Sequence, residues 1–242
     1  MTSFRERIRN SSREKQSKIV LALDFSGPVD SRIIRAKRVL QITKGSIAAV
    51  KVNHHLILPF GLEGLTEIID TCRNEDLPLI ADLKLNDIEA TNLNVVESLF
   101  ERGFDAVIAN PFVGYEDGLG KAIERIHALA GGILLLVYMS HRGAMEGYGL
   151  RLEGGEYLYT LFAKRARDWG ADGVIVSAKS RDMMENTRAI VGKECLIFSP
   201  GVGAQGGAPV DVSASIADFL IVGRTIVDSP EPRDVVKGLN SN

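Results

Sequence analysis

The side chains best suited to chemistry lie close together between residues 82 and 91. Asp82, Lys84 and Asp87 follow the apolar run of residues 77 to 81 directly. If residues 77 to 84 form a β-strand, side chains alternate between its faces, so Asp82 and Lys84 point to the same side. A lysine beside carboxylates keeps its proton, because nearby negative charge favours the ammonium form. The segment therefore predicts a site where Lys84 donates a proton and does not attack as a free amine.

Asp87 is expected where a helix begins, and Thr91 lies four residues further along the chain. Residues four apart in a helix share a face, so Asp87 and Thr91 should project together. From that position both can reach the pocket of Lys84 or the pocket of a neighbouring subunit.

Composition limits the class of protein. A chain of 242 residues, 45% hydrophobic and 25% charged, suits one domain of the size of an α/β barrel. A net charge of -2 offers no basic excess for nucleic-acid binding. Cys72 and Cys195 lack the spacing of a redox or metal motif and are expected to be packed thiols in a reducing compartment.

The four histidines show no metal-binding spacing, so we expect no metal site. Residues 1 to 17 are rich in arginine and lysine, but Glu6 and Glu14 interrupt them and no signal-type apolar region follows. We expect a solvated N-terminal helix. The longest apolar stretch, residues 133 to 139, is too short to cross a bilayer, which predicts a cytoplasmic protein without a membrane partner.

Short apolar runs alternate with longer amphipathic segments eight times. The predicted strands span residues 18–24, 46–53, 77–84, 105–110, 132–140, 171–177, 195–201 and 218–224. Eight such units predict a single-domain (β/α)8 TIM barrel over residues 18–242, preceded by a basic extension over residues 1–17. An open doubly wound sheet is the alternative, but no GxGxxG motif follows the first strand. We find no internal repeat beyond the βα unit.

Polar residues gather where these strands end, which is the face that carries function in a barrel. Asp24, Lys51, Asp82, Lys84 and Asp87 would form a ring of alternating charge there. One interpretation is a salt-bridge network that merely closes the barrel mouth. Five such residues on one face favour an active site.

Two segments predict a phosphate site at the last two strands. The glycine-rich run 199–207 follows the seventh strand, and Gly223-Arg224 follows the eighth. Glycines let backbone N–H groups approach an anion, and the arginine fork matches phosphate oxygens. A glycine-rich run alone could be a simple turn. Ser140 ends the fifth strand without the GxSxG elbow of a hydrolase, so its hydroxyl is expected to bind a substrate heterocycle.

Together these motifs resemble the orotidine 5'-phosphate decarboxylase family over roughly residues 18 to 228. The resemblance rests on the DxKxxD run at 82–87 with Thr91, on Asp24 and Lys51, on Met139-Ser140-His141, and on the PGVGAQGG run at 200–207 followed by Val222-Gly223-Arg224. Asn110-Pro111 and Arg142 depart from the family pattern and affect only the expected detail of the pocket.

The resemblance implies decarboxylation of orotidine 5'-monophosphate (OMP) to uridine 5'-monophosphate (UMP), the last step of pyrimidine synthesis, without metal or organic cofactor. It implies that Lys84 protonates C6 and that Asp82 faces the substrate carboxylate. Lys51 and Asp24 would hold the ribose and Ser140 the pyrimidine. Gln205 and Arg224 would take the phosphate, with backbone from Val202 and Gly223, and Pro200 is expected among the substrate-binding residues. Asp87 and Thr91 would come from the second subunit of a homodimer.

Two other functions are compatible with parts of the pattern. The DxKxxD run also occurs in sugar-phosphate decarboxylases and aldol-type synthases, which use magnesium and typically carry a glutamate where this chain has Lys51. A noncatalytic nucleotide-binding barrel is the second alternative, and the intact set of Asp82, Lys84 and Asp87 argues against it.

Overall fold

The computed structural model describes residues 2–178, 181–201 and 216–241, and these form a closed barrel of eight parallel strands. The strands are β1 Ile19–Ala22, β2 Ala49–Asn53, β3 Leu79–Leu85, β4 Ala106–Ala109, β5 Gly132–Tyr138, β6 Gly173–Val176, β7 Leu196–Pro200 and β8 Phe219–Val222. Each strand pairs with the next in the sequence, and β8 pairs with β1. The predicted TIM barrel and all eight predicted strands are confirmed.

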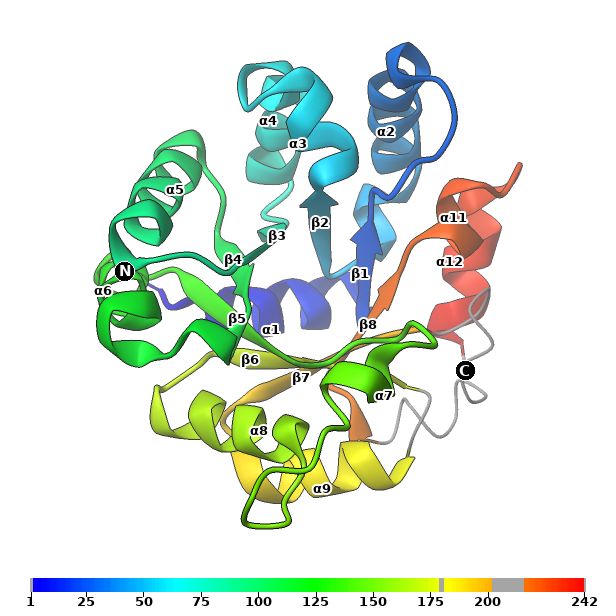
Figure 1. Cartoon of the computed structure of the whole chain (residues 1–242). Helices are drawn as coiled ribbons and strands as arrows, with labels where there is room; N and C mark the ends of the chain where they lie inside the picture. The colour runs from blue at the N-terminus through cyan, green and yellow to red at the C-terminus, as the bar shows by residue number, and fades with distance from the viewer. Residues whose placement is uncertain (1, 179–180, 202–215, 242) are drawn as a thin grey trace.

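One helix, α1, precedes the first strand, and the helices after it follow the strands and surround the barrel (Figure 1). The helices are α1 Phe4–Lys15, α2 Val29–Thr43, α3 His54–Phe60, α4 Thr66–Asn74, α5 Glu89–Arg102, α6 Gly120–Ala128, α7 Ala144–Gly147, α8 Leu158–Asp168, α9 Arg181–Val191, α11 Arg224–Val227 and α12 Pro232–Asn240. Short helical turns lie at Lys44–Ser46, Glu63–Leu65, Pro111–Val113 and Tyr115–Leu119 (η4). Within the described ranges, no helix is long and apolar enough to cross a membrane.

The core has two parts because strand side chains alternate between the faces of the sheet. One cluster fills the barrel interior with residues such as Ile80, Ile108, Leu134 and Phe198. The other lies between the strands and the surrounding helices. On β2 and β3, Lys51 and Asp82 stand two residues beyond the interior residues Ala49 and Ile80. The same alternation that packs the interior therefore turns these two charged side chains toward the barrel axis.

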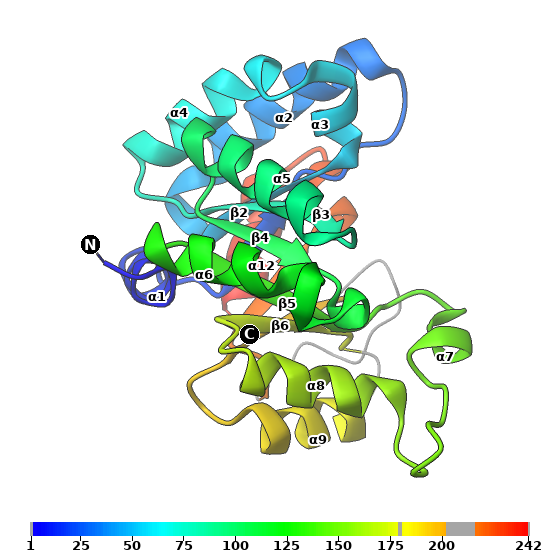
Figure 2. The same ribbon diagram turned by 60° about the vertical axis from the view of Figure 1, so that its left-hand side comes forward.

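Helix α1 closes the N-terminal end of the barrel, opposite the end at which α7 lies (Figure 2). Phe4 and Ile8 are fully buried and belong to the interior cluster, and the Ser11 hydroxyl donates to the carbonyl of Ala48 at 2.8 Å. A Cβ at Gly132 would lie only 2.3 Å from the Phe4 ring, so this position requires glycine. The predicted helix is present, but the expectation that it is solvated was wrong for this face.

Three aspartates at the same end form a repeat. Asp105, Asp172 and Asp218 each stand immediately before an even-numbered strand. Their carboxylates accept from the backbone N–H groups of Leu79, Ile133 and Ile197, at 2.7, 3.0 and 2.7 Å. In each case the aspartate N–H donates back to the carbonyl of that same residue. What recurs is a contact between neighbouring strands, since the three aspartates have no fixed spacing in the sequence.

In the remaining pair of strands, β1 and β2, no aspartate takes this position. Ala48 occupies the corresponding place before β2, and its N–H donates to the carbonyl of Ile19 in the same way. The acceptor for the N–H of Ile19 is the Ser17 hydroxyl, at 3.1 Å. In the other three pairs the aspartate forms a clasp, a pair of hydrogen bonds that joins two neighbouring strands at their start, whereas Ser17 bonds within its own segment and the bond that crosses from β2 to β1 comes from Ala48. Helix α1 reaches three of the four pairs, through Ser11 to Ala48, Arg7 to Asp105 and Arg5 to Asp172.

Candidate active site

A chain of four charged side chains crosses the C-terminal mouth of the barrel. The ammonium nitrogen of Lys51 lies 2.7 Å from Oδ2 of Asp82 and 3.2 Å from Oδ1 of Asp24. The ammonium nitrogen of Lys84 lies 2.7 Å from Oδ1 of Asp82. Asp82 therefore bridges two lysines with its two oxygens. Four of the five residues expected in the charged ring are joined.

Burial differs sharply between the two lysines. The Lys51 side chain is 4% exposed, whereas the Lys84 side chain is 34% exposed. A buried lysine that already contacts two carboxylates is held in place, while a half-buried lysine can meet a ligand. Of the two lysines, Lys84 is the more accessible from the barrel mouth.

The electrostatics keep Lys51 and Asp82 charged. Burial opposes ionisation of Lys51, but the carboxylates of Asp82 and Asp24 outweigh it and raise the pKa of the lysine. Burial likewise opposes ionisation of Asp82, but Lys51 and Lys84 outweigh it and lower the pKa of the carboxyl group. The centre of the site is thus a fixed carboxylate between two ammonium groups.

Lys84 reaches this position through an irregular backbone. Its φ angle is +50°, in the left-handed region that residues with a side chain rarely adopt, and the pairing of β3 with β4 shifts between Ala81 and Leu85. The strand therefore bulges at the lysine, yet Lys84 still lies on the side of Asp82. The simple alternation used for the prediction gives the correct side but misses the bulge.

Asp87 and Thr91 follow β3 in the chain and are exposed. Asp87 stands just before α5, and its carboxylate accepts from the N–H of Ile88 at 2.7 Å. Among the ion pairs of the described residues, none involves Asp87. Of the expected ring of five, four residues therefore form an open chain of ion pairs in the described part of the structure.

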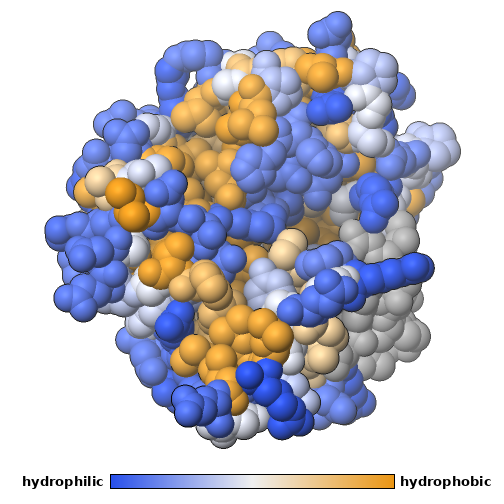
Figure 3. Space-filling view, in the orientation of Figure 1, coloured by the Kyte–Doolittle hydropathy of each residue, from blue (hydrophilic) through white to orange (hydrophobic). Residues whose placement is uncertain are grey.

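The other predicted residues occupy neighbouring strand ends. Ser140 follows β5, Pro200 ends β7, Gly223 connects β8 to the short helix α11, and Arg224 is the first residue of that helix. Arg224 is exposed. Val202 and Gln205 lie outside the described residues. Figure 3 shows hydrophilic residues gathered over the middle of this face, with hydrophobic patches around them.

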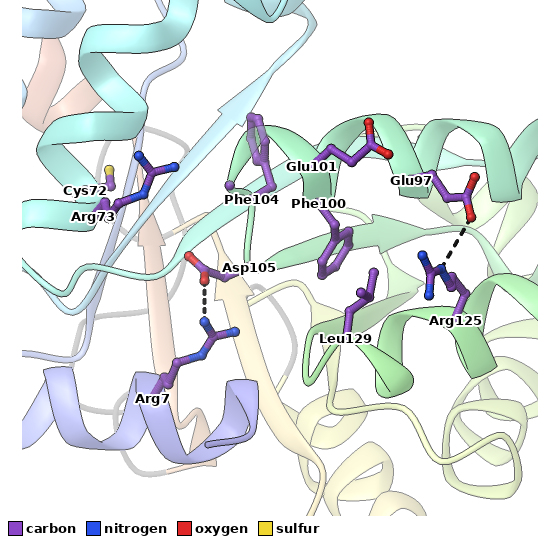
Figure 4. A pocket seen from close by; sticks show the side chains of 11 residues that line it. Arg7, Cys72, Arg73, Glu97, Phe100, Glu101, Phe104, Asp105, Arg125 and Leu129 are labelled. Carbon is purple, nitrogen blue, oxygen red and sulfur yellow. Dashed lines mark hydrogen bonds and ion pairs between the residues drawn. The ribbon is translucent and has the colours of Figure 1, made fainter. Parts of the chain in front are cut away.

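A cavity of about 410 Å³ lies at the opposite end of the barrel, between α1, α4, α5 and α6. Figure 4 shows Arg7 paired with Asp105 and Arg125 paired with Glu97 across it. Arg73, which also lines the cavity, pairs with Asp70. The cavity lies at the end of the barrel away from Lys51, Asp82 and Lys84, so we do not assign it to the same site as these residues.

A (β/α)8 barrel whose strand ends carry a lysine and carboxylates belongs to the class of barrel enzymes that act on a small substrate. The family model "Orotidine 5'-phosphate decarboxylase / HUMPS family" matches residues 17–239. This chain therefore belongs to that family. The resemblance seen in the sequence is confirmed, as is the assignment to an enzyme of the decarboxylase class.

Relatives and solved structures agree with the family. The chain is 35% identical to an orotidine 5'-phosphate decarboxylase of Methanosarcina barkeri over 93% of each chain, and 35% identical to that of Pyrococcus abyssi over 90% of this chain and 95% of the relative. The structure of the Pyrococcus horikoshii enzyme matches with a TM-score of 0.74 and 33% identity, over 92% of this chain and 97% of that one. The Methanocaldococcus jannaschii orotidine 5'-monophosphate decarboxylase complexed with the inhibitor BMP matches with a TM-score of 0.79 and 28% identity, over 93% and 97%.

Proposed function

We propose that this enzyme converts OMP to UMP and carbon dioxide, the last step of pyrimidine synthesis, with Lys84 as the proton donor to C6. The observation that carries the proposal is the placement of Lys84. Its ammonium group is half-exposed in the barrel mouth and is held at 2.7 Å by a carboxylate that stays ionised. A proton source at a fixed position is what the reaction needs from the protein.

The chemistry explains why a cation is required. When the bond between C6 and the carboxyl carbon breaks, its electron pair stays on C6, in the plane of the ring, where no carbonyl group can delocalise it. Nearby positive charge must stabilise this pair. The Lys84 ammonium group supplies that charge and then a proton, so C6 becomes C–H and the lysine becomes a neutral amine that regains a proton from solvent.

The other members of the charged chain have separate roles. We place Asp82 against the substrate carboxylate and assign the ribose hydroxyls to Lys51 and Asp24. Lys51 is fixed by both carboxylates, so it can present the remaining N–H of its ammonium group in one direction. The exposed part of Asp24 leaves an oxygen available as an acceptor: its side chain is 30% exposed.

We assign the phosphate to the ends of β7 and β8, the usual phosphate position of such barrels. Arg224 would provide the charged fork and Gly223 a backbone N–H, and by the family resemblance Gln205 and the backbone of Val202, which lie outside the described residues, would also bind the phosphate; Pro200 would contact the substrate. Ser140, at the end of β5, would bind the edge of the pyrimidine. Binding energy from the distant phosphate can then be used to order the charged residues around C6.

We further propose a homodimer in which Asp87 and Thr91 complete the site of the partner subunit. Two observations support this. Asp87 is exposed and forms no ion pair with the charged residues of its own chain within the described part of the structure. Large apolar side chains stand exposed on the loops and helices that follow β2, β3 and β4, namely Leu58, Ile88 and Phe112, at 74%, 67% and 65%. These residues stand in three consecutive βα units, and we infer that they belong to the surface that meets the second subunit.

The proposal includes catalysis without a metal or organic cofactor. It also includes a cytoplasmic location, which the two buried free thiols, Cys72 and Cys195, support. The deciding experiment is an absorbance assay of OMP consumption with and without excess EDTA. We expect the same turnover in both. A magnesium requirement, or turnover only of a sugar phosphate, would favour the related synthases, and no absorbance change would favour a nucleotide-binding protein without activity.

A further inference from the structure

Asn92 is a buried polar residue in the first turn of α5. Its side chain is 1% exposed and lies on the same stripe as the buried Val96 and Leu99. The amide nitrogen of the side chain donates to the carbonyl of Asp87 at 2.5 Å and to the carbonyl of Gly118 at 3.1 Å. One side chain therefore joins the loop after β3 to the turn η4, which follows β4.

The chemistry of this contact requires an amide. Both neighbouring atoms are carbonyl oxygens, which only accept hydrogen bonds, so the group between them must donate twice. An NH₂ group does this without introducing a charge. A carboxylate of the same shape would place its oxygen against two carbonyl oxygens, and an apolar residue would leave both carbonyls unsatisfied.

The loop that Asn92 holds contains Asp87. No side chain caps α5, because its N-cap residue is Ile88. The Asp87 carboxylate contacts the N–H of Ile88, so its direction depends on the backbone of residues 86 to 88. Within the described structure, the Asp87 carbonyl accepts from the Asn92 side chain. The start of α5 is also joined to α6 by the exposed ion pair of Glu89 with Lys121.

We propose that Asn92 is a positioning residue that fixes Asp87 for its role in catalysis. The proposal rests on the proposed function, in which Asp87 serves the active site of the partner subunit. If the Asp87 carboxylate is to reach the active site of the partner subunit, its backbone must be fixed by contacts within its own subunit. Asn92 supplies this hold from the interior, beyond the reach of solvent.

The test is a double-mutant cycle of Asn92→Ala and Asp87→Asn, with kcat and KM for OMP measured per active site titrated with a tight-binding UMP analogue. Asn92→Ala is expected to lower kcat by about 10-fold to 100-fold, as small displacements of a positioned group do. In the Asp87→Asn chain the same change should cost less than about 2-fold, because the group it positions is already altered. Lys121→Ala, which removes the exposed link, should change kcat by less than about 2-fold and is the matched control.

The outcomes separate the two claims. Full activity of Asp87→Asn would overturn the proposed role of Asp87. An impaired Asp87→Asn with an equal effect of Asn92→Ala in both backgrounds would overturn the positioning role and leave Asn92 as a residue for stability alone. Amide hydrogen exchange gives a second measurement: residues 86 to 88 should exchange faster in Asn92→Ala and not in Lys121→Ala. If Asn92→Ala does not fold, Asn92→Ser, which leaves a polar group, takes its place in the same cycle.

Discussion

Lys51 and Asp82 form a buried ion pair, with the ammonium nitrogen 2.7 Å from Oδ2, and the other oxygen of Asp82 is left for Lys84. The buried Lys51 thus sets the orientation of the Asp82 carboxylate, and the carboxylate sets the position of the half-buried Lys84. Removing Asp82 should affect stability and catalysis through two different partners.

Asp82→Asn should destabilise the fold by up to about 3 kcal/mol at neutral pH, because Lys51 then stays buried with Asp24 as its remaining carboxylate. The pKa of Asp82 is lowered in the folded state, so its contribution is present above the unfolded value of about 4 and is lost as pH falls through the folded value. Urea unfolding at pH 7 and pH 3 measures this. The variant should lose less stability in acid than the unmodified chain, and parallel losses would contradict the prediction.

Lys84→Ala should reduce turnover of OMP by at least about 10³-fold, because both the stabilising charge and the proton source are lost. Binding of a UMP analogue should remain within about 3-fold, since the phosphate contacts lie elsewhere. Steady-state kinetics and calorimetry give the two values. Near-normal turnover in this variant would remove Lys84 from the mechanism.

Arg224→Ala should raise KM for OMP by about 100-fold with a smaller loss in kcat, as expected for loss of charge-assisted hydrogen bonds to phosphate. Orotidine, which lacks the phosphate, provides the control. The variant and the unmodified chain should use orotidine equally poorly. A penalty with orotidine, or an equal loss in kcat and KM for OMP, would show that Arg224 acts on something other than the phosphate.

Two inactive variants should restore activity when mixed. Lys84→Ala and Asp87→Asn chains that are unfolded and refolded together form heterodimers in which one of the two shared sites is intact. Random pairing then gives about a quarter of the unmodified activity. If Asp87 served its own chain, no site would be intact and the mixture would stay inactive.

The fold could be predicted almost entirely from sequence, because eight continuous apolar runs separated by amphipathic segments leave few other architectures. The strand ends then brought Asp24, Lys51, Asp82 and Lys84 to one face, as expected. The signal for the buried side of α1 was also present, since Phe4, Ile8 and Ser11 are spaced as one helical face. The high charge of the segment concealed it.

Other features depend on contacts that sequence does not display. The bulge at Lys84 follows from how β3 pairs with β4. The three aspartates are separated by 67 and 46 residues (172 minus 105, 218 minus 172), so a search within one βα unit does not reveal that they make the same contact. Asn92 did leave a trace, as a polar residue on the apolar stripe that continues through Val96 and Leu99. Its carbonyl partners could be identified only from coordinates.

The clasps formed by Asp105, Asp172 and Asp218 have a consequence for how such a molecule can change over generations. These three contacts join separate pairs of strands at the N-terminal end of the barrel. The charged side chains Asp24, Lys51, Asp82 and Lys84 lie at the C-terminal end. A substitution among the charged side chains therefore need not weaken the aspartate contacts, and the loss of one aspartate contact leaves the other two in place. A barrel built in this way can change the chemistry at its C-terminal end and keep the hydrogen bonds that hold its strands together at the N-terminal end.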